Sequence, residues 1–316
     1  MRQYALRRLA YLPLIAAFVA ILTFFVLRSP WSQDPVTLMV GMGGSVEQEE
    51  ALREDLGLDD PLVVQFGRWL GDLARLDFGE TFRGRQPVWD EVVERMPVTF
   101  EILFLSVFFS ATIGITLGVI TATRQNTLLD YAFRGLAVFG QSIPDFFLLV
   151  LLIVLPSIWW NYSPPVGGHV SIFQDPWENL RLYLPPTLLL AVGGSAGMMR
   201  LVRSTMLEVM RQDYMRTAAA KGLPNRSVVW SHALRNSMIP IVTYLGNQVT
   251  VLFFGALILE QIFSINGIGQ FLFISVSTFD FPVVQFLVLY TALIVITINI
   301  LVDLSYAVID PRVRYR

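Results

Sequence analysis

The sequence predicts an all-α membrane protein that crosses the bilayer six times. Only 15% of its 316 residues are charged, 54% are hydrophobic, and the mean hydropathy is +0.57, whereas soluble chains carry about 25% charged residues. Six stretches approach the ~20 apolar residues that a membrane-spanning helix needs. They are residues 9–27, 102–123, 136–160, 184–199, 238–259 and 283–302.

The basic residues predict that both termini are cytoplasmic. Segments 1–8, 124–135, 200–237 and 303–316 together hold 15 Lys and Arg residues, whereas the short loops 161–183 and 260–282 hold one. Short cytoplasmic loops are enriched in basic residues, and long segments cross the membrane regardless of charge. The long segment 29–96 is therefore placed outside. The first apolar run is too long for a signal peptide and no small-x-small cleavage site follows it, so we interpret it as an uncleaved span.

The outer segment carries its own helix signals. Ser45 and Gln48 have the spacing of a capping box, which predicts a short helix that ends near Gly57. Asp60 followed by Pro61 predicts a second helix start, with Asp60 as the N-cap and Pro61 as the first helical residue. Two interpretations are open: a small cap that lies on the membrane surface, or a docking surface for a partner outside.

These observations divide the chain into two parts. Residues 1–96 form the first span with a small helical extracytoplasmic segment, and residues 97–316 form a five-span core with a cytoplasmic loop at 200–237. Inside the core, Gly114 and Gly118, and likewise Gly193 and Gly197, have the small-xxx-small spacing that allows helices to approach closely.

Several kinds of chemistry are absent from the sequence. There is no cysteine, the two histidines His169 and His232 are far apart, and the single lysine, Lys221, is not part of a phosphate-binding loop. Neither a His-Glu-x-x-His motif nor a Gly-x-Ser-x-Gly motif occurs. A net charge of −2 does not favour nucleic-acid binding. We therefore expect neither an enzyme nor a resident cofactor or metal in this chain.

Asp145 is the one ionisable residue that the spacing places deep in a predicted span, close to the middle of the membrane. Pro144 precedes it and is expected to kink the span near Gly140. Two interpretations are open: a buried carboxyl that hydrogen-bonds a neighbouring span, or a group that lines a transport pathway with Gln141, Asn247 and Gln248. In the second case a carboxylate would favour substrates that carry a free amine or another cation.

The cytoplasmic loop 200–237 is the most unusual segment. Helix formers continue to Ala220, Gly222 is placed to end the helix, and Pro224 is placed to begin another at an N1-like position. The small residues 217–220 would let a second protein approach the backbone. A helix that lies on lipid headgroups is the alternative, although such a helix needs a strongly apolar face.

This loop resembles the coupling motif, or EAA loop, of binding-protein-dependent ABC permeases. The acidic first residue of the triplet is missing and Pro240 lies further downstream than in the general motif, and both departures are similar to the dipeptide/oligopeptide branch. The matching residues are Asp213, Tyr214, Arg216, Thr217, Ala218, Ala220, Lys221 and Gly222, followed by residues 232–236. Further matches are Tyr4, Arg7–Leu9, Asp34–Val36, Leu56–Asp59, Pro61–Leu62, Ser142–Pro144, Gly267, Gly269 and Asp310–Arg312.

The resemblance implies a type I ABC importer permease, the first of two permease subunits, in a bacterial or archaeal cytoplasmic membrane. It implies a second permease, two ATPase subunits that bind ATP and Mg, and an extracytoplasmic binding protein that delivers di- or oligopeptides. Residues 213–222, Ala219 included, would contact an ATPase, and we expect Gly267 and Gly269 near the binding protein. Nickel chelates, glutathione or heme are alternative substrates, and a membrane scaffold or sensor that does not transport is a distant alternative.

Overall fold

The computed structural model describes residues 2–29, 35–40, 45–82, 84–168 and 170–309. These residues form helices and no strand. The helices are α1 (Arg2–Leu27), α2 (Pro35–Val40), α3 (Val46–Asp55), α4 (Leu62–Ala74), α5 (Val88–Thr123), α6 (Leu128–Gln141), α7 (Asp145–Trp160), α8 (Pro176–Met210), α9 (Asp213–Ala220), α10 (Asn225–Ser227), the π-helix η1 (Val228–Leu234), α11 (Met238–Phe263), α12 (Ile268–Ser277) and α13 (Phe281–Ile309).

Four of the helices in the described part of the chain are long and apolar enough to cross a membrane: α5, α8, α11 and α13. A fifth candidate span is the pair α6 and α7, which are bent by 93° at the break between them. In α1 the described apolar stretch is shorter, Pro13–Leu27. The structure thus confirms an all-helical protein with several spans and supports four or five of the six predicted.

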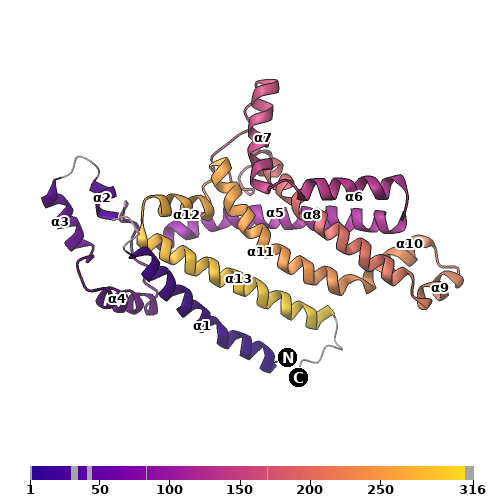
Figure 1. The fold of residues 1–316 in the computed structure, drawn as a ribbon, viewed down its shortest axis with the longest axis horizontal. Helices are drawn as coiled ribbons and strands as arrows, with labels where there is room; N and C mark the ends of the chain where they lie inside the picture. The colour runs from indigo at the N-terminus through magenta and orange to yellow at the C-terminus, as the bar shows by residue number, and fades with distance from the viewer. Residues whose placement is uncertain (1, 30–34, 41–44, 83, 169, 310–316) are drawn as a thin grey trace. The chain divides into compact units, whose positions relative to one another are not determined.

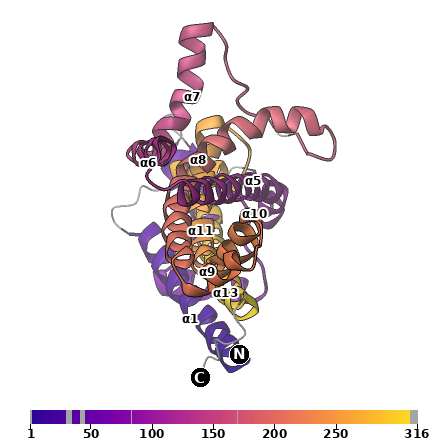
Figure 2. The same ribbon diagram turned by 90° about the vertical axis from the view of Figure 1, so that its right-hand side faces the viewer.

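The third predicted span differs most from its prediction. Instead of one kinked helix over 136–160, α6 ends at Gln141 and α7 begins at Asp145, with Pro144 as its N-cap. Proline has no N–H to donate and disfavours helical backbone in the residue before it, so Pro144 breaks the helix completely. Figure 2 shows α6 nearly end-on while α7 runs away from it at a steep angle.

The chain divides into two compact units. One contains residues 98–266 with both ends of the chain, and the other contains residues 6–97 and 267–296. In the first unit, α8 packs on α5, α6, α7 and α11 (Figure 1). Gly114 and Gly118 of α5 lie against Met198 and Val202 of α8, where an added Cβ would come within 2.6 and 2.5 Å of those side chains. The predicted close packing at this glycine pair is confirmed.

The second unit contains the predicted outer segment. The capping box of Ser45 and Gln48 is formed, and Gly57 follows the helix with a φ of +63°. The start of α4 corrects the prediction, because Pro61 is the N-cap and Asp60 instead pairs with Arg68 at 2.6 Å.

An aromatic cluster joins α4 to α1 within this unit. The rings of Phe66 and Trp69 lie 5.1 and 5.7 Å from that of Phe24. Arg28 covers Phe24 at 4.0 Å and donates to Gln65 at 2.8 Å. Burial lowers the pKa of Arg28 to about 10, so the guanidinium keeps its charge at neutral pH.

Candidate functional site

The coupling segment, residues 213–234, comprises α9, α10 and η1 and follows directly after α8 (Figure 1). Gly222 separates α9 from α10 with a φ of +79°, as the sequence predicts for a helix-ending glycine. Pro224 is the N-cap of α10 rather than its first residue. The chain then continues as the π-helix η1, which propensities did not predict and which often marks functional positions.

One side chain anchors α9 to the helix bundle. Met215 is only 3% exposed and packs in a cluster with Met206 of α8, Val229 of η1 and Val119 of α5. Burying a methionine side chain contributes about 1.5–3 kcal/mol. The coupling segment is therefore fixed to the ends of α5 and α8 through an apolar contact.

The other predicted contact residues leave an outward surface on α9. Tyr214 is 47% exposed, and Arg216 forms an exposed ion pair with Asp213 at 3.5 Å. Thr217, Ala220, Lys221 and Gly222 are exposed and Ala218 is half-buried, whereas the side chain of Ala219 lies outside the described residues. A surface of small and charged groups around one buried anchor suits contact with another protein better than insertion among lipid chains.

A polar cavity of about 250 Å³ lies between α6, α7, α8 and α11. We call it the polar cavity; its lining residues are Gln141, Asp145, Gly193, Gly194, Tyr244, Asn247, Gln248, Val251 and Leu252. The four residues that the sequence nominated for a pathway therefore line one cavity. Gln141, Asp145 and Asn247 are exposed at its surface, and Gln248 is buried with 7% exposure.

Glycines of α8 make room for the polar groups. A Cβ on Gly193 would strike the carboxylate of Asp145, and one on Gly194 would lie 2.5 Å from Nε2 of Gln248. A Cβ on Gly197 would strike the hydroxyl of Tyr244. The spacing of Gly193 and Gly197 predicts helix packing alone, but in the structure both glycines face polar side chains.

The surroundings of Asp145 bear on both interpretations of this residue. The carboxylate makes no hydrogen bond or ion pair with any described residue, so the described part of the chain does not supply the hydrogen-bond partner that the first interpretation requires. Asp145 begins α7 instead of lying in the middle of a helix. Free backbone N–H groups at a helix N-terminus stabilise a negative charge.

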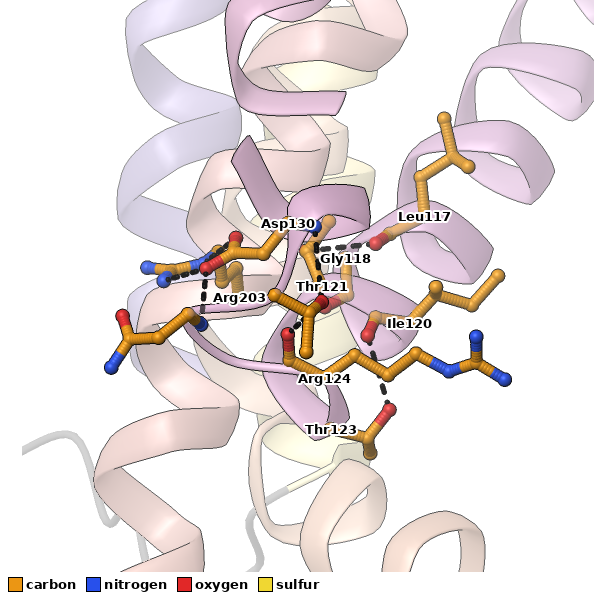
Figure 3. Close-up of polar contacts among 10 residues, drawn as sticks. Leu117, Gly118, Ile120, Thr121, Thr123, Arg124, Asp130 and Arg203 are labelled. Carbon is orange, nitrogen blue, oxygen red and sulfur yellow. Dashed lines mark hydrogen bonds and ion pairs between the residues drawn. The ribbon is translucent and has the colours of Figure 1, made fainter. Parts of the chain in front are cut away.

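A buried ion pair that sequence reasoning missed joins α6 to α8. Asp130 receives two hydrogen bonds of 2.8 Å from Arg203 and a third of 3.0 Å from the backbone N–H of Asn126. Figure 3 shows the carboxylate and the guanidinium facing each other beside the end of α5. Asp130 is 0% exposed. Asp130 and Arg203 are 73 residues apart in the sequence and belong to no recognised motif, so the local sequence does not identify them as partners.

The two glycines expected near a binding protein lie at the start of α12. Gly267 is its N-cap, with a φ of −109°, and Gly269 lies in its first turn. Both are buried. Both glycines lie at the start of a helix, and their contact with a binding protein stays a prediction.

The chain matches known transport proteins over nearly its whole length. Residues 114–315 match the family described as binding-protein-dependent transport system inner membrane component, and residues 1–103 match the family described as the N-terminal part of such membrane components. The chain belongs to this family. The resemblance seen in the sequence is confirmed, and the permease is a multi-pass membrane protein whose family is not the catalytic part of the transporter.

Two relatives show which branch the permease resembles. It is 38% identical over 310 residues to a putative peptide transport system permease protein of Brucella abortus, covering 98% of each chain. It is 37% identical over 341 residues to the dipeptide transport system permease protein DppB of Escherichia coli, covering 100% of each.

Two solved structures share the fold. An inward-facing MetNI methionine ABC transporter superposes with a TM-score of 0.52 at 18% identity, over 69% of this chain and 96% of that one. The crystal structure of an amino acid ABC transporter with histidines superposes with a TM-score of 0.52 at 14% identity, over 69% of this chain and 93% of that one. Of the motif residues matched in the sequence, Asp34 and Asp310–Arg312 lie outside the described residues.

Proposed function

We propose that this protein is a pathway-forming permease subunit of an ATP-driven importer for di- and oligopeptides. The observation that carries the proposal is the full-length similarity to a dipeptide transport permease, together with an exposed coupling segment at the predicted position. A second permease would complete the pathway, two ATPase subunits would supply energy by binding ATP and Mg, and a binding protein would deliver the substrate outside.

The coupling segment is the proposed contact with an ATPase subunit. Its outward face is exposed while Met215 fixes it to the ends of α5 and α8. Movement of α9 would therefore be transmitted through packed side chains to the helices that line the polar cavity. This division of labour agrees with a sequence that has no phosphate-binding loop for nucleotide.

The proposed topology has six spans, both termini in the cytoplasm, and residues 29–96 outside. Because the chain has no cysteine, single cysteines can be labelled without background. Gly71 is exposed, and in the described part of the chain no heavy atom lies within 4 Å of an added Cβ, so Gly71→Cys is a mild change. An impermeant maleimide should label Gly71→Cys in intact cells and should label Lys221→Cys only after permeabilisation. The reverse pattern would reject this orientation.

The substrate class is tested with the assembled importer in proteoliposomes. A dipeptide should stimulate ATP hydrolysis and be taken up, whereas a nickel chelate, glutathione and heme, supplied with the same binding protein, should not. Uptake of one of these three instead of the dipeptide would assign the chain to that substrate. Failure to co-purify with any ATPase subunit would favour a scaffold or sensor.

A further inference from the structure

We propose that the polar cavity is a recognition site for a cationic nitrogen, an ammonium or guanidinium group, of the substrate in transit. The inference rests on the proposed import function and adds the charge of the group that the pathway selects. It predicts that this permease subunit, and not only the binding protein, discriminates among substrates.

The lining of the cavity supplies acceptors for such a group. Asp145 is the only ionisable acid or base along the described lining apart from the phenol of Tyr244. Arg200 interacts electrostatically with Tyr244 but does not line the cavity. The side-chain amides of Gln141, Asn247 and Gln248 add oxygen acceptors around a single negative charge.

Gln248 provides a second and independent sign of a missing partner. Its Nε2 donates to the hydroxyl of Ser110, while its Oε1 has no hydrogen-bond partner among the described residues although Gln248 is only 7% exposed. A buried acceptor that is left unpaired destabilises the folded chain. An ammonium has three N–H donors, so it could bind Asp145 and satisfy Gln248 together.

The glycines of α8 indicate that this space is kept for polar groups. Alanines at Gly193 and Gly194 would place methyl groups against Asp145 and Gln248, and would fill the cavity wall with apolar surface. The lining residues Gly193, Asn247 and Gln248 also belong to the middle parts of α8 and α11, two helices long enough to span the membrane. Polar groups at that depth are costly to expose to lipid, so the open side of the cavity should face water or the second permease.

The test compares wild type and Asp145→Asn in the complete importer reconstituted in proteoliposomes with its binding protein. The probes are the dipeptide Ala-Lys, the same peptide acetylated on the lysine side chain, and the same peptide acetylated on the α-amine. Because both importers receive substrate from the same binding protein, its own preference cancels when their uptake ratios are compared. Loss of a charge-assisted hydrogen bond should lower the ratio of unmodified to acetylated peptide by about tenfold.

The two acetylated probes distinguish the sources of the cation. If the uptake ratio falls only against the peptide acetylated on the lysine side chain, the site recognises lysine-like side chains. If the ratio falls only against the peptide acetylated on the α-amine, the site recognises the peptide amino terminus. Asp145→Glu, which keeps the charge, should retain the wild-type ratios. Glu178→Gln, an exposed carboxylate on α8 that pairs with Arg181 at 3.6 Å, is the matched control and should also retain them.

Three results would overturn the inference. If Asp145→Asn leaves the uptake ratio of unmodified to acetylated peptide unchanged for both acetylated peptides, Asp145 does not sense the charge of the substrate. An equal loss of all three probes in an assembled Asp145→Asn complex would give Asp145 an architectural role and reject recognition. If wild type imports none of the peptides, the proposed peptide function itself fails, and that result is distinct from import with unchanged ratios.

Discussion

On α9 of the coupling segment Met215 is buried while most of its described neighbours are exposed, whereas the polar cavity takes its lining from four helices. The first region is specified by residues close together in the chain: helix formers, one glycine with positive φ and one proline. The second exists only when helices far apart in sequence pack together. Local changes should therefore damage the coupling segment directly, whereas the polar cavity should depend on contacts that lie elsewhere.

The largest expected effect comes from the ion pair that holds α6 and α8 together. Arg203→Leu would leave Asp130 buried and unpaired, which costs about 3–5 kcal/mol. We expect a clear fall in the thermal unfolding midpoint of the detergent-purified protein. Because α6 carries Gln141 and α8 carries the cavity glycines, peptide uptake should fall as well.

A double variant makes this prediction specific. Asp130→Asn combined with Arg203→Leu removes both charges and should recover much of the stability that Arg203→Leu loses. Arg181→Leu, which breaks an exposed pair with Glu178, should change the midpoint little because such pairs contribute at most about 1 kcal/mol. An Arg203→Leu protein as stable as wild type would show that the pair does not hold these helices.

The next effect concerns Gly222. A β-branched residue is strained at its φ of +79°, whereas asparagine tolerates this region. No heavy atom of the described residues lies within 4 Å of a Cβ added at Gly222, so the strain would come from the backbone alone. We expect Gly222→Val to lower uptake at least about tenfold with normal membrane insertion, and Gly222→Asn to keep most of it. Equal uptake by the two variants would contradict a role for the backbone angle.

The features that the sequence predicts are those that depend on residues close together in the chain. The outer capping box, the glycine after α9 and the span assignments of α5, α8, α11 and α13 follow from local patterns, and the structure contains them. Pro144 predicts a disturbance of the helix from local sequence alone, and the structure shows a full break where a kink is expected. The partner of Arg203 and the role of Gly194, by contrast, depend on what packs against each residue. Periodicity and motif spacing carry no information about such partners.

A smaller effect is expected for two variants on α9, which separate the buried anchor Met215 from the exposed surface proposed to contact the ATPase. Met215→Ala removes the buried anchor, so α9 should loosen and ATP hydrolysis should continue with reduced uptake. Tyr214→Ala removes an exposed side chain, so the permease should keep its stability and bind the ATPase more weakly. Co-purification and the ratio of ATP hydrolysed to peptide transported would be measured for both. Identical behaviour of the two variants would show that anchor and contact surface cannot be separated.

The smallest effect is expected for Gly194→Ala. The added methyl would lie 2.5 Å from Nε2 of Gln248 and 2.9 Å from the hydroxyl of Ser110. Because the amide is the far end of a flexible side chain, it can swing aside without moving the helices, so the protein should fold normally. The displaced amide would disturb the cavity, and uptake of Ala-Lys should fall about two- to threefold, equivalent to less than about 1 kcal/mol. Gly135→Ala on α6, where an added Cβ meets no described residue within 4 Å, is the matched control and should transport as wild type does. A Gly194→Ala protein that also transports normally would mean that the space beside Gln248 is not used, and the glycines of α8 would then serve helix packing alone.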